Sequence, residues 1–121
     1  MTDSTPTQMA PLSKSFRAGD LIFVSGMVPL ENGVLQGESV TEQTDYVLRA
    51  MAAELATHGA TMADVVKTTV LMADADRDWP EMNEAYRPHF PDRKPARSAY
   101  GVVLADPRLL VEIEAVAVIS S

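Results

Sequence analysis

The sequence predicts an α+β fold: a mixed β-sheet with two helices packed on one face. Apolar, β-rich runs alternate with two helix-like segments, and the 121 residues fit one domain spanning 1–121. Nothing remains in the chain to form a third layer. The second face of the sheet would therefore stay exposed, and we expect oligomerisation to cover it.

The N-terminal third of the chain predicts two strands and a tight turn. Residues 1–12 indicate a flexible arm, and a short strand follows over residues 14–18. The apolar run 21–26 is typical of a buried strand, which Pro29 ends. Asn-Gly at 32–33 can adopt positive φ and predicts a tight turn.

A long amphipathic helix comes next. Ser39 and Glu42 match a capping box, in which each residue satisfies a backbone N–H of the other. Gly59 is suited to the left-handed conformation that closes a helix. Residues on the predicted buried face recur at helical spacing: Thr44, Leu48, Met51 and Leu55.

The following segments predict a buried strand and a shorter helix. Residues 65–72 are rich in β-branched side chains, which favour strands. Asp78 has the character of a helix N-cap, with Pro80 tolerated in the first turn. We expect this helix to end near Tyr86, before Pro88.

Two more strands, over residues 96–104 and 111–118, complete the predicted sheet. The turn signal Asp106-Pro107 separates them. The resulting order is strand, strand, long helix, strand, short helix, strand, strand. This order favours a single mixed sheet with both helices on one side.

The charge and composition disfavour several classes of function. The net charge is −7, so the surface should repel nucleic acids and anionic membranes. There is no Cys, and His58 and His89 lack ligand spacing, so we expect no metal site. The sequence shows neither a signal peptide nor a long apolar run, which predicts a cytoplasmic protein.

Arg97, at the start of a predicted strand, is the strongest candidate for a functional residue. A buried guanidinium without a partner costs several kcal/mol. Its planar fork suits a carboxylate held through two hydrogen bonds, such as that of a small ligand. The alternative is an ion pair across the sheet with Glu112 or Glu114.

Other candidate site residues carry weaker signals. Glu112 and Glu114 share one strand face, where they either serve acid-base chemistry or form a solvated surface. Ser25 and Gly26 end a buried strand, where glycine permits a ligand to approach the backbone. Asn83 lies on the shorter helix and by itself indicates only a surface position.

Five segments in combination resemble the Rid family of reactive-intermediate (enamine/imine) deaminases, also called endoribonuclease L-PSP-like proteins. The resemblance spans about residues 10–119, nearly the whole chain. The matching segments are FVSG at 23–26, DVVKTTV at 64–70, MNEAY at 82–86, KPARS at 94–98 and VEIEAVA at 111–117.

The resemblance implies a chorismate-mutase-like homotrimer with sites between subunits. It implies hydrolysis of 2-aminoacrylate- or 2-iminobutanoate-type enamines and imines to 2-oxo acids and ammonia, without metal or organic cofactor. Arg97 would bind the substrate carboxylate, and Glu112 would place or activate water. Ser25, Gly26 and Asn83 would line the pocket.

The resemblance also assigns Leu12 and Ala99 to the pocket. At these two positions, and at Met27 next to Gly26, the chain departs from the residues that are common in the family. Leu12 stands where Tyr is common, Met27 where Gln is common, and Ala99 where Cys is frequent. All three replacements make the pocket more apolar. We therefore expect a pathway-specific member acting on a larger or more hydrophobic imino acid.

Two competing functions follow from the same residues. A non-catalytic trimer that binds a small carboxylate, or assists a pathway enzyme, is favoured by the missing hydroxyl at Leu12. Endoribonuclease activity is attributed to some family members. The acidic charge and the lack of paired His argue against it in this chain.

Overall fold

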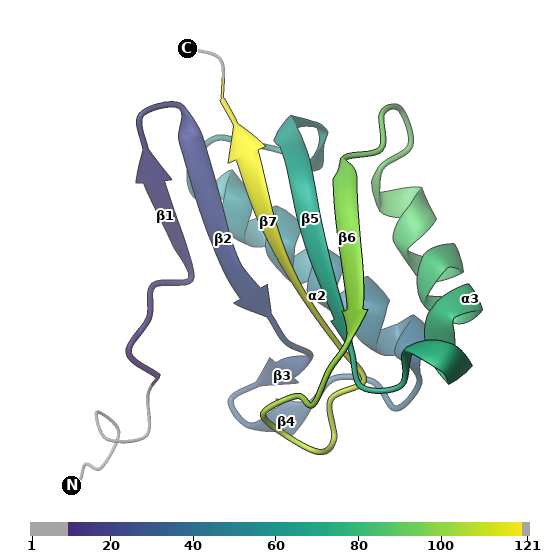
Figure 1. The fold of residues 1–121 in the computed structure, drawn as a ribbon. Helices are drawn as coiled ribbons and strands as arrows, with labels where there is room; N and C mark the ends of the chain where they lie inside the picture. The colour runs from purple at the N-terminus through teal and green to yellow at the C-terminus, as the bar shows by residue number, and fades with distance from the viewer. Residues whose placement is uncertain (1–9, 120–121) are drawn as a thin grey trace, which may run out of the picture.

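The computed structural model describes residues 10–119, which form a five-stranded sheet with two helices behind it (Figure 1). The sheet order is β1-β2-β7-β5-β6, and only the β5–β6 pair is parallel. The strands are β1 (Ser15–Ala18), β2 (Leu21–Met27), β5 (Val65–Met72), β6 (Ala96–Gly101) and β7 (Val111–Val118), and the helices are α2 (Val40–Ala56) and α3 (Ala75–Tyr86). Most of the predicted arm, residues 1–9 of 1–12, lies outside the described residues.

Helix α2 confirms the prediction from its capping residues. The Ser39 side chain accepts the backbone N–H of Glu42, and the Glu42 carboxylate accepts the N–H of Ser39. Gly59 adopts a φ of 77° just beyond the helix, as expected of a residue that ends it. The face predicted from helical spacing is buried, namely Thr44, Leu48, Met51 and Leu55.

Helix α3 begins earlier than the sequence predicted. Its N-cap is Asp74, whose carboxylate accepts the backbone N–H of Arg77 at 3.1 Å. The predicted cap, Asp78, lies inside the helix and pairs with the Arg77 guanidinium at 2.9 Å. Pro80 is therefore an interior residue. The prediction was wrong because Asp74 has the same capping chemistry as Asp78. Its carboxylate caps the N–H of Arg77, three residues later, so the helix begins before Asp78.

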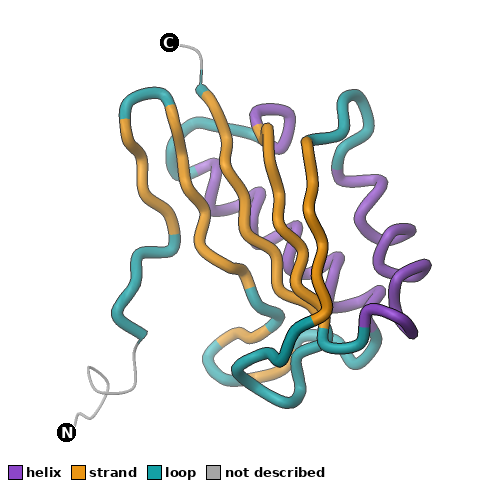
Figure 2. Tube along the Cα trace, viewed as in Figure 1, coloured by secondary structure: helices purple, strands orange, loops and turns teal. Residues whose placement is uncertain are grey.

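The strands lie where the sequence predicted them, with two differences: one strand is shorter, and an unpredicted hairpin of two short strands is present. The strand expected over 96–104 ends at Gly101. A two-stranded hairpin, β3 (Leu30–Glu31) and β4 (Val34–Leu35), encloses the predicted turn. Asn32 and Gly33 both have positive φ there, as that kind of turn requires. The hairpin lies at the lower end of the sheet (Figure 2).

The two faces of the sheet differ in the way the pattern predicted. The face toward the helices is buried and apolar, and it includes Ile22, Val70 and Ile113, each fully buried. On the other face, Phe16 and Phe23 are cross-strand partners and remain 64% and 44% exposed. No helix among the described residues is long and apolar enough to span a membrane.

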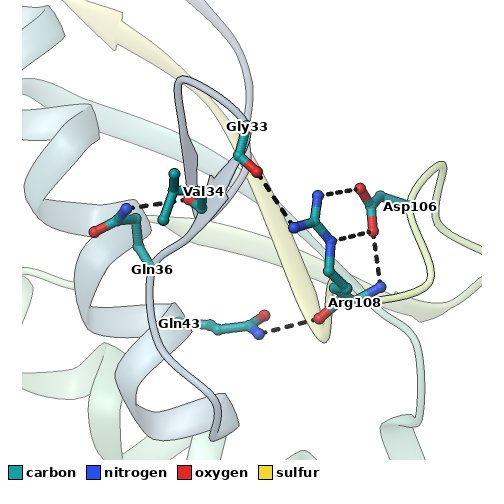
Figure 3. Close-up of polar contacts among 6 residues, drawn as sticks. All are labelled: Gly33, Val34, Gln36, Gln43, Asp106 and Arg108. Carbon is teal, nitrogen blue, oxygen red and sulfur yellow. Dashed lines mark hydrogen bonds and ion pairs between the residues drawn. The ribbon is translucent and has the colours of Figure 1, made fainter.

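A polar cluster fixes the loop that leads into β7 (Figure 3). Buried Gln43 of α2 donates to the carbonyl of Arg108 at 3.2 Å and accepts the N–H of Leu110 at 2.8 Å. The Arg108 guanidinium pairs with Asp106 and donates to the carbonyl of Gly33 in the hairpin. The position at which β7 begins, one residue before Glu112, is thereby tied to both the helix and the hairpin.

Candidate functional site

Arg97 lies on the helix side of the edge strand β6. It is the register partner of Thr68, whose side chain is fully buried beneath α3. The Arg97 guanidinium carbon sits 4.9 Å from the ring centre of Tyr86 and 5.5 Å from that of Trp79. These α3 rings hold the cation by cation–π attraction, which restricts its orientation without consuming its hydrogen-bond donors.

The alternative ion pair between Arg97 and the β7 glutamates does not form. Glu112 is the register partner of Leu71, three residues beyond Thr68, so it points to the opposite face from Arg97. Within residues 10–119 the guanidinium contacts no carboxylate, and its one polar contact is the Met82 sulfur at 3.9 Å.

A cavity of about 270 Å³ opens beside this guanidinium. Such a volume lies near the lower end of the ~300–1,000 Å³ range of small-molecule sites. The predicted site residue Asn83 lines it from α3, so the structure brings Arg97 and Asn83 together. The complete lining is Asn83, Tyr86, Arg87, Lys94, Pro95 and Arg97.

Glu112 lies half-buried on the helix-free face of the sheet, next to Gly26 of β2. A Cβ on Gly26 would lie 2.1 Å from the Glu112 carboxylate oxygen, so the glycine leaves room for this side chain. Burial raises the pKa of the Glu112 carboxyl, and the nearby Glu114 carboxylate raises it further. A raised pKa makes Glu112 more basic and brings its titration nearer to neutral pH.

A second, wider cavity of about 960 Å³ lies between the β2 end and the outer face of α2. Leu12, Ser25, Gly26 and Met27 all line it. The Ser25 hydroxyl donates to the carbonyl of Ser13 at 2.6 Å, which ties the segment before β1 to the end of β2. The structure therefore groups four of the residues that the sequence analysis singled out.

The predicted site residues thus form two separate groups within one chain. Arg97 and Ala99 belong to β6 and Asn83 to α3 beside it, whereas Ser25 and Gly26 belong to β2 on the other side of the sheet (Figure 1). Three strand spacings of roughly 4.8 Å separate β2 from β6, about 14 Å in all. A single small substrate cannot contact both groups of one chain.

Sequence reasoning missed the residues that surround Arg97. The sequence patterns gave no role at the site to Trp79, Lys94 or Arg87. Trp79 and Tyr86 are seven residues apart on α3, a spacing that places both on one helix face. This spacing was the signal that could have identified the two rings as neighbours.

Comparison with known proteins identifies the family. The family model described as endoribonuclease L-PSP matches residues 2–119. The Arabidopsis thaliana protein named Reactive Intermediate Deaminase A, chloroplastic, is 39% identical over 96% of this chain, which spans 63% of that relative's length. The Mus musculus 2-iminobutanoate/2-iminopropanoate deaminase is 36% identical, with 97% of this chain and 87% of the relative covered.

The fold comparison agrees. The crystal structure of Escherichia coli TdcF with bound serine superposes with a TM-score of 0.84 at 28% identity, covering 93% of this chain and 91% of that one. The α+β topology and the match to this solved structure define the class of protein to which the chain belongs. The chain belongs to the endoribonuclease L-PSP family, which includes the YjgF and Rid proteins, as its sequence motifs predicted.

Proposed function

We propose that this protein hydrolyses imines and enamines of small 2-amino acids to 2-oxo acids and ammonia. The observation that carries the proposal is the Arg97 guanidinium, which faces a cavity beside Asn83 and has no carboxylate partner within residues 10–119. Such a group is suited to bind the carboxylate of a substrate through two hydrogen bonds. Relatives of 36–39% identity carry deaminase names.

The chemistry requires orientation and a water molecule more than it requires a strong catalyst. With the substrate carboxylate on Arg97, water adds to the imine carbon, and the resulting carbinolamine releases ammonia as its C=O bond forms. Glu112 takes a proton from the attacking water and passes it to the imine nitrogen, and it then carries the hydroxyl proton of the carbinolamine to the departing nitrogen. Its raised pKa supports this role, because proton transfer is most effective near the working pH. No metal or organic cofactor is required by this scheme.

We further propose that the active site forms between neighbouring copies of the chain in a homotrimer. Arg97, Asn83 and Ala99 would come from one copy, and Leu12, Ser25, Gly26 and Glu112 from the next. The separation of these two groups within one chain supports this arrangement. So does the helix-free face, whose exposed aromatic and aliphatic side chains include Phe16, Phe23 and Val118.

A non-catalytic trimer that binds small carboxylates is the second candidate. Leu12 favours it, since it lines the second cavity without a hydroxyl that could hold water or substrate. The bound serine of E. coli TdcF is an example of a small amino acid held by a relative of this fold. Endoribonuclease activity stays disfavoured by the net charge of −7, and the cytoplasmic location stays a prediction.

The test is turnover of imines made in situ. A PLP-dependent lyase generates 2-aminoacrylate or 2-iminobutanoate, and loss of the imine is followed with and without this protein. We expect acceleration by the wild type, at least 100-fold less with Arg97→Ala, and little change with Arg93→Ala, which removes an exposed charge outside the cavity.

Three outcomes discriminate between the candidates. Equal rates for wild type and Arg97→Ala across several imino acids, with carboxylate binding intact in the wild type, would select the binding function. If the wild type shows no turnover and Arg97→Ala loses carboxylate binding, the binding function would also be selected. RNA cleavage that survives in Arg97→Ala would indicate a contaminating nuclease.

A further inference from the structure

The cavity beside Arg97 contains more positive charge than a single carboxylate requires. Three of its six lining residues are cations, Arg87, Lys94 and Arg97, and none is acidic. The chain as a whole carries a net charge of −7, so this concentration runs against its average. A cavity lined by one sign of charge attracts ligands of the opposite charge.

Lys94 is held in place at this cavity. Its ammonium donates to the backbone carbonyl of Arg87 at 3.2 Å and to that of Phe90. An ammonium has three donors, so one remains available. The two carbonyls orient the ammonium but leave its full charge uncompensated.

Arg87, the second additional cation, is exposed and weakly paired. Its guanidinium lies 3.6 Å from the Glu84 carboxylate, in a pair whose side chains are 61% and 77% exposed. Exposed pairs of this kind contribute little free energy, so a ligand can compete with Glu84 for Arg87. The Arg87 backbone carbonyl accepts a hydrogen bond from Lys94, and both residues line the same cavity.

We propose that the substrate of this protein carries a second acidic group, as an imine or enamine of a 2-amino dicarboxylic acid does. Arg97 binds the carboxylate next to the imine carbon, and Lys94 with Arg87 binds the distal carboxylate. This inference rests on the proposed function for its substrate class. The distal carboxylate takes no part in the bond changes at the imine carbon, and the apolar residues Leu12 and Met27 belong to the other half-site.

A pair of stable product analogues tests the inference by binding alone. The 2-oxoglutarate dianion and 2-oxopentanoate have the same number of carbons and differ by a carboxylate in place of a methyl group. Calorimetric titration of the full-length protein gives both dissociation constants at about 0.15 M ionic strength, which limits nonspecific attraction. We expect the wild type to bind 2-oxoglutarate about tenfold more tightly, or better.

Four variants assign the preference to residues. Lys94→Met and Arg87→Met should each reduce it at least threefold, while Lys94→Arg, which keeps the charge, should retain most of it. Arg93→Met is the matched control, because it removes an exposed cation one residue from Lys94 that does not line the cavity. Circular dichroism establishes whether each variant is folded. If Lys94→Met is unfolded, the assignment of the preference to residues rests on Arg87→Met and Lys94→Arg.

Equal binding of the two analogues by the wild type, or tighter binding of 2-oxopentanoate, would overturn the inference. So would an unchanged preference in both Lys94→Met and Arg87→Met. Turnover of 2-iminobutanoate and of 2-iminoglutarate is measured separately in the same preparations. A diacid binding preference without turnover of either imine would reject the deaminase proposal and leave the second anion-binding position standing.

Discussion

The contact between Gly26 and Glu112 allows the side chain that we propose as the proton carrier to be displaced by one methyl group. Gly26→Ala would place a Cβ 2.1 Å from the Glu112 Oε2, 2.9 Å from its Cδ and 3.1 Å from its Cγ. Gly26 is not among the glycines with positive φ, so the backbone itself accepts alanine. The strain therefore falls on the Glu112 side chain, which must rotate away.

The expected change in stability is small, and the expected change in activity is large. Alanine gains ~0.5–1 kcal/mol over glycine within a strand, and a displaced Glu112 rotamer costs ~0.5–1.5 kcal/mol. These terms nearly cancel, so the melting temperature should shift by no more than about 5 °C. Removing a positioned proton-transfer group typically costs 10²–10⁴-fold in rate, so kcat/KM should fall about 100-fold.

Thermal unfolding by circular dichroism and the imine-loss assay measure the two effects on one preparation. Gly101→Ala is the matched control, because its Cβ would make only ordinary contacts, with the Ala75 Cβ at 3.4 Å and the Met72 carbonyl oxygen at 4.0 Å. The double variant Gly26→Ala/Glu112→Gln should be no slower than Glu112→Gln alone. Full activity in a folded Gly26→Ala protein, or in Glu112→Gln, would refute the role given to Glu112.

Two further predictions concern stability. Burial and Glu114 raise the pKa of Glu112 above its ordinary 4.5, so the folded state binds this proton more tightly than the unfolded state does. Wild-type stability should accordingly fall as the pH rises from 4.5 through the raised folded value, and Glu112→Gln should flatten that fall in a series of melting temperatures. Tyr86→Phe removes the 2.6 Å hydrogen bond to the buried Thr68 hydroxyl, and should lower the free energy of unfolding in urea by ~1–2 kcal/mol. It should leave carboxylate binding intact because the ring over Arg97 remains; a variant as stable as wild type would contradict this account.

Local patterns were sufficient to predict most of the elements. The Ser39–Glu42 capping box, the positive-φ turn at Asn32-Gly33 and the β-branched run of β5 act over a few residues, and each was found where expected. The start of α3 was wrong because Asp74 and Asp78 offer the same capping chemistry. In the structure the Asp74 carboxylate is the one that caps the helix, and Asp78 pairs with Arg77 inside it.

The sequence by itself determined the family, the helices on one side of the sheet, and the candidate residues Arg97 and Glu112. It could not determine how these residues lie relative to one another. A shift of one residue in strand register moves a side chain to the opposite face, and the pairing of β5 with both β6 and β7 sets Arg97 and Glu112 on opposite faces. The tertiary structure alone decided this, because register depends on contacts between segments far apart in the chain, and it also gathered Arg87, Lys94 and Arg97 around one cavity.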